Sequence, residues 1–355
     1  MTPLHLRPTQ FVDSPVGRDG EVARLAGGLQ WFAAYEVIEG SERRVVPIAE
    51  FERTLGASEE RAAQLHARIT APRPPLTLGA RTLRFDQPQI AGILNVTPDS
   101  FSDGGQLHDD PQAATAAGVD MTIAGAALVD LGGESTRPGA APTWEGDEIA
   151  RIQPVCAALN AAGALVSIDT RKAAVMEAAL AAGAAIVNDV SALLWDDRAL
   201  EVVAKARCPV VLMHSPDPAR GPHGGNGYTN VLTEVFDWLE ARIAAVVAAG
   251  IDRAKIIVDP GIGFGKGIQD NLTLINGLAM LHGLGCPIML GASRKRMIGA
   301  LANEAPPAER LGGSITLALK GVEQGAQILR VHDVAETVQA VRVWRGLRDQ
   351  ALVAR

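Results

Sequence analysis

Residues 92–105, GILNVTPDSFSDGG, combine a short apolar segment with a loop of small polar side chains. The apolar segment ends in Asn95, and the loop after it carries two carboxylates, several hydroxyls and one aromatic residue, Phe101. Amide oxygens and carboxylates, such as that of Asp103, are groups that bind hard cations such as Mg²⁺. We therefore expect a polar ligand, and with it a cation, to bind where this segment ends.

Other reactive side chains follow the ends of further short apolar segments. In chain order they are Glu134, Arg137, Asp169, Asn188, Asp189, His214, Asp259, Ser293, Lys295, Arg330 and His332. In a parallel (β/α) barrel the carboxyl ends of all strands meet at one mouth, where the active site lies. This placement predicts a single site built from many strand ends.

Several of these residues have a simpler interpretation when each is taken alone. Asp169 precedes a helical segment, so a helix N-cap is about as expected as a ligand contact, and the same holds for Asn188 and Asp189. His214 is better explained as a structural histidine than as a catalytic one. Arg137 has a surface-loop alternative, but the proline and glycine after it restrict the backbone, which favours function.

The glycine-rich segment 259–267, DPGIGFGKG, does not match a phosphate-binding loop. A Walker A motif needs a glycine where Pro260 stands and a serine or threonine where Gly267 stands, and the GxGxxG dinucleotide pattern is also absent. The segment offers a glycine-lined wall with Asp259 at a strand end and Phe264 projecting from it. Such a wall suits a planar heterocycle.

Basic side chains gather after the last two predicted strands. Residues 293–296, SRKR, follow one strand, while Arg330 and His332 lie two residues apart and hence on one face of the next. Arg, Lys and His donate to phosphate oxygens, and barrels often hold phosphate in this region. Surface charge is the alternative for SRKR alone, but the apolar strand before it would deliver the cluster to the mouth.

A repeated pattern predicts the fold that positions these residues. An alanine-rich helical segment ends in a glycine suited to a left-handed C′ position, at Gly125, Gly163, Gly183 and Gly325, and a short apolar strand follows. Four further strands, from Gln89, Pro209, Lys255 and Pro287, have slightly different entries. The total of eight strands alternating with helices is the number that closes a parallel barrel. We predict an α/β fold, a TIM (β/α)8 barrel with a short N-terminal extension or accessory subdomain.

Composition changes near residues 72–75, APRPP, which divides the chain into two parts. Residues 1–75 are an accessory segment of unknown role, with strands expected at 29–38 and 45–48 and an amphipathic helix at 48–69. Residues 76–350 are the catalytic barrel. It begins with a hairpin at 76–85 that turns at Gly79 and Ala80 and closes one end of the barrel.

Bulk properties exclude several classes of protein. The chain has 355 residues, 47% hydrophobic content and a net charge of −7, which argues against a nucleic-acid partner. Cys156, Cys208 and Cys286 lie far apart, so no disulfide framework or zinc site is expected, and a reducing cytoplasm fits best. No apolar run approaches the roughly 20 residues that span a bilayer, so no membrane partner is expected.

Together these motifs resemble the dihydropteroate synthases, folate-pathway enzymes of the pterin-binding superfamily. GILNVTPDSFSDGG, DLGGESTRPGA, SIDT, VNDVSA, VLMH, DPGIGFGK, SRKRMIG and RVHDV follow the order of the family over residues 76–346. The stretch after VLMH, SPDPARGPHGG from Ser215, departs from the family pattern. The resemblance implies a transferase that joins 6-hydroxymethyl-7,8-dihydropterin diphosphate to 4-aminobenzoate, in a cytoplasmic homodimer with Mg²⁺ as cofactor.

The resemblance also implies roles for individual residues. A pterin pocket would comprise Asp169, Asn188, Met213, Asp259, Phe264 and Lys295. The diphosphate would contact Asn95, Thr136, Arg330 and His332, with Asn95 also binding Mg²⁺. Aminobenzoate would contact Phe101, Arg137, Pro138 and Ser293. The catalytic set would be Asp103, Arg137, Lys295, Arg330 and His332.

Two alternatives use the same barrel. A pterin-binding methyltransferase that moves a methyl group from methyltetrahydrofolate to a corrinoid shares the ring pocket but needs no diphosphate site. A non-catalytic pterin-binding paralogue would keep the pocket and lose the loop chemistry. The TPDSFSD, SRK and RVH segments favour the synthase over both.

Overall fold

A computed structural model describes residues 3–55, 60–97, 110–135, 139–219, 221, 223 and 227–353. Its centre is a parallel sheet of eight strands, in the order β12-β11-β10-β9-β8-β7-β14-β13. The strands are β7 (Gln89–Asn95), β8 (Leu128–Gly132), β9 (Val166–Asp169), β10 (Ile186–Asp189), β11 (Val210–Met213), β12 (Ile256–Asp259), β13 (Met289–Leu290) and β14 (Ile328–Val331). A parallel bridge between Val258 and Ile288 joins the two ends of this order, so the sheet closes. The predicted barrel is confirmed.

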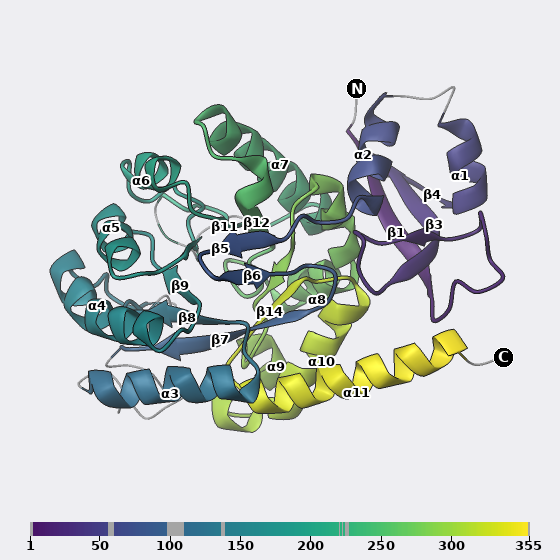
Figure 1. Cartoon of the computed structure of the whole chain (residues 1–355). Helices are drawn as coiled ribbons and strands as arrows, with labels where there is room; N and C mark the ends of the chain where they lie inside the picture. The colour runs from purple at the N-terminus through teal and green to yellow at the C-terminus, as the bar shows by residue number, and fades with distance from the viewer. Residues whose placement is uncertain are drawn as a thin grey trace.

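Helices follow the strands and surround the barrel (Figure 1). The α-helices are α3 (Pro111–Ala124), α4 (Glu145–Ala161), α5 (Ala173–Ala181), α6 (Ala199–Ala206), α7 (Val231–Ala248), α8 (Ile268–Asn276), α9 (Arg296–Leu301), α10 (Leu311–Glu323) and α11 (Val334–Val353). Three 3-10 helices are η1 (Arg253–Lys255), η2 (Leu278–Leu284) and η3 (Pro307–Glu309). The four glycines of the repeat all have positive φ, as predicted. None of the helices in the described part of the chain is long and apolar enough to cross a membrane.

The N-terminal residues form a four-stranded sheet with two helices beside the barrel (Figure 1). Its elements are β1 (Leu4–Val12), β2 (Ala23–Arg24), β3 (Trp31–Glu39), β4 (Glu42–Pro47), α1 (Ile48–Thr54) and α2 (Glu60–Thr70). The strands predicted at 29–38 and 45–48 correspond to β3 and β4, although β4 begins earlier and ends before Ile48. The single helix predicted over 48–69 is wrong, because α1 ends at Thr54 and α2 begins at Glu60. The prediction also missed β1, in which Pro8 interrupts the apolar pattern.

The N-terminal sheet and the barrel share one apolar core. Leu6 and Ile38 belong to the same buried cluster as residues of α7 and η2. Polar contacts reinforce this junction: Arg61 and Arg68 both donate to Glu240 of α7, at 2.7 and 3.0 Å. Because the two parts bury apolar surface against each other, the extension is fixed to the barrel wall.

A hairpin fills the base of the barrel. Strands β5 (Leu76–Leu78) and β6 (Arg81–Leu83) pair antiparallel around the predicted turn. Leu76, Leu83 and Phe85 form an apolar cluster with inward-facing side chains of the barrel strands. The barrel members are Ala91, Leu128, Ile186, Val211, Ile257, Met289 and Ile328. The expectation that the hairpin closes one end of the barrel is confirmed.

Candidate active site

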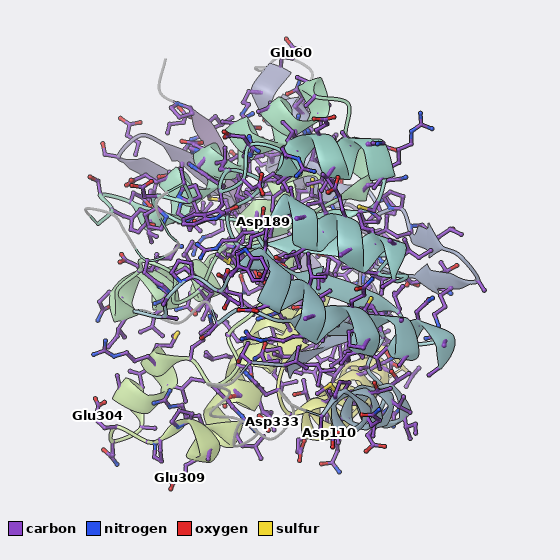
Figure 2. All side chains as sticks on the ribbon, turned by 90° about the vertical axis from the view of Figure 1, so that its left-hand side faces the viewer. Glu60, Asp110, Asp189, Glu304, Glu309 and Asp333 are labelled. Atoms are coloured by element: carbon purple, nitrogen blue, oxygen red, sulfur yellow. The ribbon has the colours of Figure 1, made fainter. Side chains whose placement is uncertain are left out.

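Strand alternation separates the polar residues at the mouth into two groups. Asn188 and Asp189 are adjacent on β10, so their side chains point to opposite faces of the strand. Asp189 accepts hydrogen bonds from the backbone N–H groups of Ser191 and Leu193, at 2.7 and 2.9 Å, and holds a local turn. Figure 2 shows it within the body of the molecule, whereas Glu304, an exposed residue, lies at the periphery. Asp189 is therefore a structural residue, and Asn188 faces the barrel interior.

The centre of the site is a guanidinium between two carboxylates. Arg330 Nε lies 2.5 Å from Asp130 Oδ2, and its Nη2 lies 2.5 Å from Asp169 Oδ2. Asn188 Nδ2 donates to the same oxygen of Asp130, at 3.0 Å. Lys172, not Asp169, occupies the N-cap position of α5. The N-cap alternative for Asp169 is therefore wrong.

Asp130 is a central residue of the site that the sequence prediction missed. It lies in the middle of β8 with no exposed surface, whereas the prediction considered only residues at strand ends. The available signal was a carboxylate inside an otherwise apolar strand, LVDLG. A buried charge is costly unless it is paired, so it indicates a buried partner.

Two carboxylates, those of Asp130 and Asp169, share the single guanidinium of Arg330, so this group of three carries excess negative charge. Burial raises the pKa of Asp169 to about 7; Arg330 opposes this shift and Asp130 adds to it. Burial works against the charge of Arg330, but Asp130 and Asp169 raise its pKa above the ordinary value. Burial also lowers the pKa of Lys295 to about 8, assisted by Arg330. The site is electrostatically prepared for a ligand that donates hydrogen bonds.

The opposite wall is flat and apolar, with one carboxylate. Met213, Phe264 and Val190 form a small buried cluster. The Lys295 ammonium lies 4.1 Å from the centre of the Phe264 ring, a cation–π contact. Asp259, at the end of β12, accepts a hydrogen bond from the backbone of the following loop, and burial raises its pKa. These residues lie together as the sequence predicted, and we call the place between them, where a planar ring is expected, the slot.

A histidine of the loop after β11 also reaches this wall. The His223 ring stacks on Phe264, with centroids 5.1 Å apart and planes 15° from parallel. The sequence analysis noted that this loop departs from the family pattern, but it gave His223 no role. His214, which opens the loop, packs edge-on against Trp238 at 5.0 Å, and burial lowers its pKa to about 3. His214 is thus a buried neutral histidine, in line with its structural interpretation.

The basic side chains of the SRKR segment do not all lie in the site. Lys295 enters the site, but Arg294 forms a two-pronged ion pair with Asp333, at 2.5 and 3.1 Å, and Arg296 is exposed. The expectation that the whole cluster faces the mouth is therefore wrong. Alternating residues of a short turn cannot all point the same way.

Ser293 and His332 face each other at the ends of β13 and β14. Ser293 Oγ lies 3.0 Å from His332 Nδ1 and accepts a hydrogen bond from the His332 backbone N–H at 3.2 Å. The pair joins the two strands at which phosphate binding was predicted. It places a hydroxyl and an imidazole beside Arg330.

Asn95 ends β7, directly opposite a glycine of the next strand. A Cβ atom at Gly132 would lie 3.1 Å from Asn95 Oδ1 and 3.6 Å from Asp169 Cβ. Glycine at this position therefore leaves space between the amide and the carboxylate. Asn95 is partly exposed at the end of β7.

Glu134 belongs to a buried network behind the mouth. Its carboxylate lies 2.9 Å from Arg171 Nε and 2.7 Å from Lys172 Nζ, and it accepts a hydrogen bond from the backbone N–H of Thr143. Lys172 also pairs with Glu148 at 2.5 Å. Glu134, which the sequence placed among the mouth residues, therefore holds the loop between β8 and α4.

Five predicted site residues lie outside the described residues. They are Phe101, Asp103, Thr136, Arg137 and Pro138. The others, apart from Asn95, Ser293 and His332 at the rim, meet around the slot between Arg330 and Phe264. A ring whose edge carries N–H and C=O groups would find carboxylates, an amide and an ammonium there.

Comparisons with known proteins agree with this geometry. A family model described as pterin binding enzyme matches residues 91–332. The fold and site thus define a pterin-binding barrel enzyme. Curated relatives carry a more specific name: the dihydropteroate synthase of Neisseria meningitidis serogroup B is 44% identical over 274 residues, 76% of this chain and 96% of the relative. That of Escherichia coli strain K12 is 43% identical over 263 residues, 74% of this chain and 92% of the relative.

Solved structures lead to the same group. Xanthomonas albilineans dihydropteroate synthase with 4-aminobenzoic acid has a TM-score of 0.72 and 46% identity, covering 78% of this chain and 98% of that one. The Burkholderia cenocepacia enzyme complexed with 7,8-dihydropteroate has a TM-score of 0.72 and 41% identity, covering 78% and 97%. The chain belongs to the dihydropteroate synthase family, as its motifs predicted. The N-terminal extension accounts for much of the chain outside these matches.

Proposed function

We propose that this protein is a transferase that condenses 6-hydroxymethyl-7,8-dihydropterin diphosphate with 4-aminobenzoate to give 7,8-dihydropteroate and diphosphate. The observation that carries the proposal is the guanidinium of Arg330 between Asp130 and Asp169, facing the apolar wall of Met213 and Phe264. The named ligands of the Xanthomonas and Burkholderia enzymes, 4-aminobenzoic acid and 7,8-dihydropteroate, support it.

The pterin ring would lie in the slot with its polar edges toward the barrel. Asp169, Asp259 and Asn188 offer oxygens to the ring N–H groups, and Lys295 donates to its carbonyl. Both carboxylates have little exposed surface in the free protein, and a donated N–H stabilises the charged form. Met213 and Phe264 exclude water from the ring faces.

Diphosphate departure is the step with the largest change in charge. The bond between the exocyclic carbon and the diphosphate oxygen breaks, leaving a delocalised cation on the pterin, and the aminobenzoate nitrogen then attacks that carbon and loses a proton. Arg330 and His332 would donate to the departing oxygens, with Asn95 and Thr136 beside them. Because the pterin itself stabilises the cation, no covalent enzyme intermediate is needed.

Asn95 fits a role as a ligand of Mg²⁺. Mg²⁺ commonly takes one or two protein oxygens and completes its shell with substrate phosphates and water. In the described part of the chain no cluster of three or more His, Cys, Asp or Glu side chains could hold a metal ion. When bound, the ion would neutralise the diphosphate.

The aminobenzoate site would form at the rim. Phe101, Arg137, Pro138 and Ser293 would contact this substrate, and Asp103 would complete the catalytic set with Arg137, Lys295, Arg330 and His332. Of these, Ser293 is held by His332 at the edge of the slot. Phe101→Ala is expected to raise the aminobenzoate KM with little change in pterin affinity.

The decisive test is diphosphate release from the dihydropterin substrate, measured with and without 4-aminobenzoate and Mg²⁺. Release that depends on both supports the proposal. No stimulation by aminobenzoate removes it, and methyl transfer from methyltetrahydrofolate would favour the methyltransferase instead. Pterin binding without turnover would favour a non-catalytic paralogue.

We also propose a cytoplasmic homodimer. Cys156, Cys208 and Cys286 are all free and buried, which is compatible with a reducing compartment. Val343 and Leu347, one turn apart on α11, are 60% and 70% exposed and would be covered by a second copy. Sedimentation velocity should show a dimer that Leu347→Glu converts to a monomer; a monomeric wild type would contradict this.

A further inference from the structure

Lys266, in the loop between β12 and α8, directs its ammonium group at the backbone. Its Nζ lies 2.9 Å from the carbonyl oxygen of Gly261, 3.1 Å from that of Phe264 and 3.3 Å from that of His214. The first two carbonyls belong to the same loop as Lys266, and the third follows β11. One side chain therefore ties the loop to itself and to the neighbouring strand.

The loop and the end of β11 approach each other closely at this point. Gly261 has φ +69°, and a Cβ atom there would lie only 1.9 Å from the carbonyl oxygen of His214. A side chain would force the two segments apart, so glycine is required. The ammonium of Lys266 donates to the carbonyls of both Gly261 and His214, so it bridges the two segments where they approach each other.

A second side chain fastens the same loop from the other side. Asn271, a buried residue of α8, accepts a hydrogen bond from the Gly263 N–H at 2.7 Å. Its amide nitrogen donates to the carbonyls of Lys266 and Gly267, at 3.2 and 2.7 Å. The loop is thus fixed to α8 by Asn271 and to β11 by Lys266.

The segments that Lys266 joins carry three of the proposed pterin contacts. Met213 immediately precedes His214, while Asp259 begins the loop and Phe264 lies within it. The Phe264 carbonyl is itself an acceptor of Lys266, so the orientation of that residue depends on the contact. Burial lowers the pKa of Lys266 to about 7, an effect that the nearby Asp259 carboxylate opposes.

We propose that Lys266 is a positioning residue for the pterin site, which sets the spacing between the Met213 end of β11 and the loop that carries Asp259 and Phe264. Lys266 contacts backbone carbonyls, and its effect on the substrate passes through the wall that it holds. This inference rests on the proposed function and adds a residue to it. Lys266 differs from a merely structural buried lysine in one consequence: its loss changes the affinity of the folded protein for the pterin.

The test measures binding rather than turnover alone. Lys266→Met keeps the length of the side chain and removes the ammonium. Calorimetric titration with 6-hydroxymethyl-7,8-dihydropterin diphosphate and Mg²⁺ should show a Kd at least tenfold higher than that of the wild type. The aminobenzoate KM should stay within twofold. Lys205→Met, at an exposed lysine of α6, is the matched control and should leave both values within twofold.

If Lys266→Met does not fold, Lys266→Gln takes its place, because the amide can still donate to the nearer carbonyls. A smaller rise in the pterin Kd, of about threefold or more, is expected. A folded variant with lower thermal stability and an unchanged pterin Kd would overturn the proposal. A wild type that binds the pterin substrate but releases no diphosphate would remove the synthase function and leave this test of binding valid, whereas a wild type that does not bind it would overturn both.

Discussion

The two ends of the barrel interior differ in chemistry although the same eight strands build them. At the base, inward-facing side chains such as Ile186, Val211 and Ile257 pack against the hairpin. At the mouth, two residues further along β8 and β10, the inward positions hold Asp130 and Asn188, together with other polar groups. The base is filled by protein, whereas the mouth keeps buried charges that protein alone satisfies only in part.

This difference separates stability from binding. Apolar contacts at the base lower the free energy of the folded state by an amount that depends on the volume they fill. Carboxylates at the mouth are buried at a cost, visible in the raised pKa values of Asp169 and Asp259, and are stabilised further when a ligand donates to them. Substitutions at the two ends should therefore have distinguishable effects.

Arg330→Met should have the largest effect, because Arg330 lies at a place in the mouth where charge also supports the fold. Removing the guanidinium leaves Asp130 and Asp169 buried without their cation, which typically costs about 3–5 kcal/mol. Urea unfolding and diphosphate release should both show a severe loss. Adding Asp130→Asn should restore part of the stability and none of the activity; unchanged stability in the single variant would contradict the pairing.

Ile257→Ala should lower stability alone. The side chain is fully buried in the cluster at the base, so its truncation should cost about 2–5 kcal/mol in the free energy of unfolding. The pterin Kd, measured by calorimetry, should stay within twofold. Ile123→Ala, at a residue of α3 that is 78% exposed, is the control and should change neither quantity. A large shift in Kd for Ile257→Ala would show that the two ends are coupled.

Asp259→Ala should have the opposite pattern. Loss of the carboxylate should weaken pterin binding at least 100-fold, about 2.7 kcal/mol, because ring N–H groups lose their acceptor. Stability should stay equal or rise, since a carboxylate whose pKa is raised by burial is removed. Calorimetry and urea unfolding check the two parts, with exposed Asp197→Ala as the control. Unchanged pterin affinity would contradict the assignment of the pocket.

The smallest expected effect is a pH dependence of stability that originates at the mouth. The pKa of Asp169 is about 7 in the folded protein and near 4 when unfolded, so the folded state binds the extra proton between these values. The contribution of Asp169 to the free energy of unfolding is therefore highest at low pH. It falls as the pH rises toward 7, by up to about 2 kcal/mol between pH 5 and 7. Urea unfolding of Asp169→Asn across this range should show a flatter profile, and an equal slope in both proteins would refute the assignment.

The sequence predicted the positions of the strands better than the roles of individual side chains. Glycines such as Gly125 and Gly183 mark helix ends because a left-handed backbone excludes most other residues. These helix ends helped to locate the strands that follow them. The single helix predicted at 48–69 was wrong because α1 ends at Thr54 and α2 begins only at Glu60. The prediction followed apolar periodicity, which locates the buried face of a helix, and gave no weight to Gly56 as a signal that a helix ends.

At the site, the errors share a physical origin. Asp130 and Lys266 were missed because each contacts a group distant in sequence: Asp130 a guanidinium 200 residues away, and Lys266 the carbonyl of His214, just after β11. Glu134 was assigned to the mouth, but its partners lie on the following βα unit. Residue type and strand position predicted several residues that face the mouth, among them Asp169, Asn188 and Asp259. The three-dimensional partners were needed to show which of the remaining polar residues are held by the protein itself.

The hairpin β5–β6 has a consequence for the order of events during turnover. Since Leu76, Leu83 and Phe85 fill the base of the barrel, we expect substrates to enter and products to leave at the mouth. On the proposed function, the pterin occupies the inner part of that passage and aminobenzoate the outer part. The inner substrate must arrive first, because a molecule at the rim would block its way. The joined product must then leave by the same route before the next pterin substrate can bind. We therefore expect an ordered kinetic mechanism, in which the pterin substrate binds before aminobenzoate.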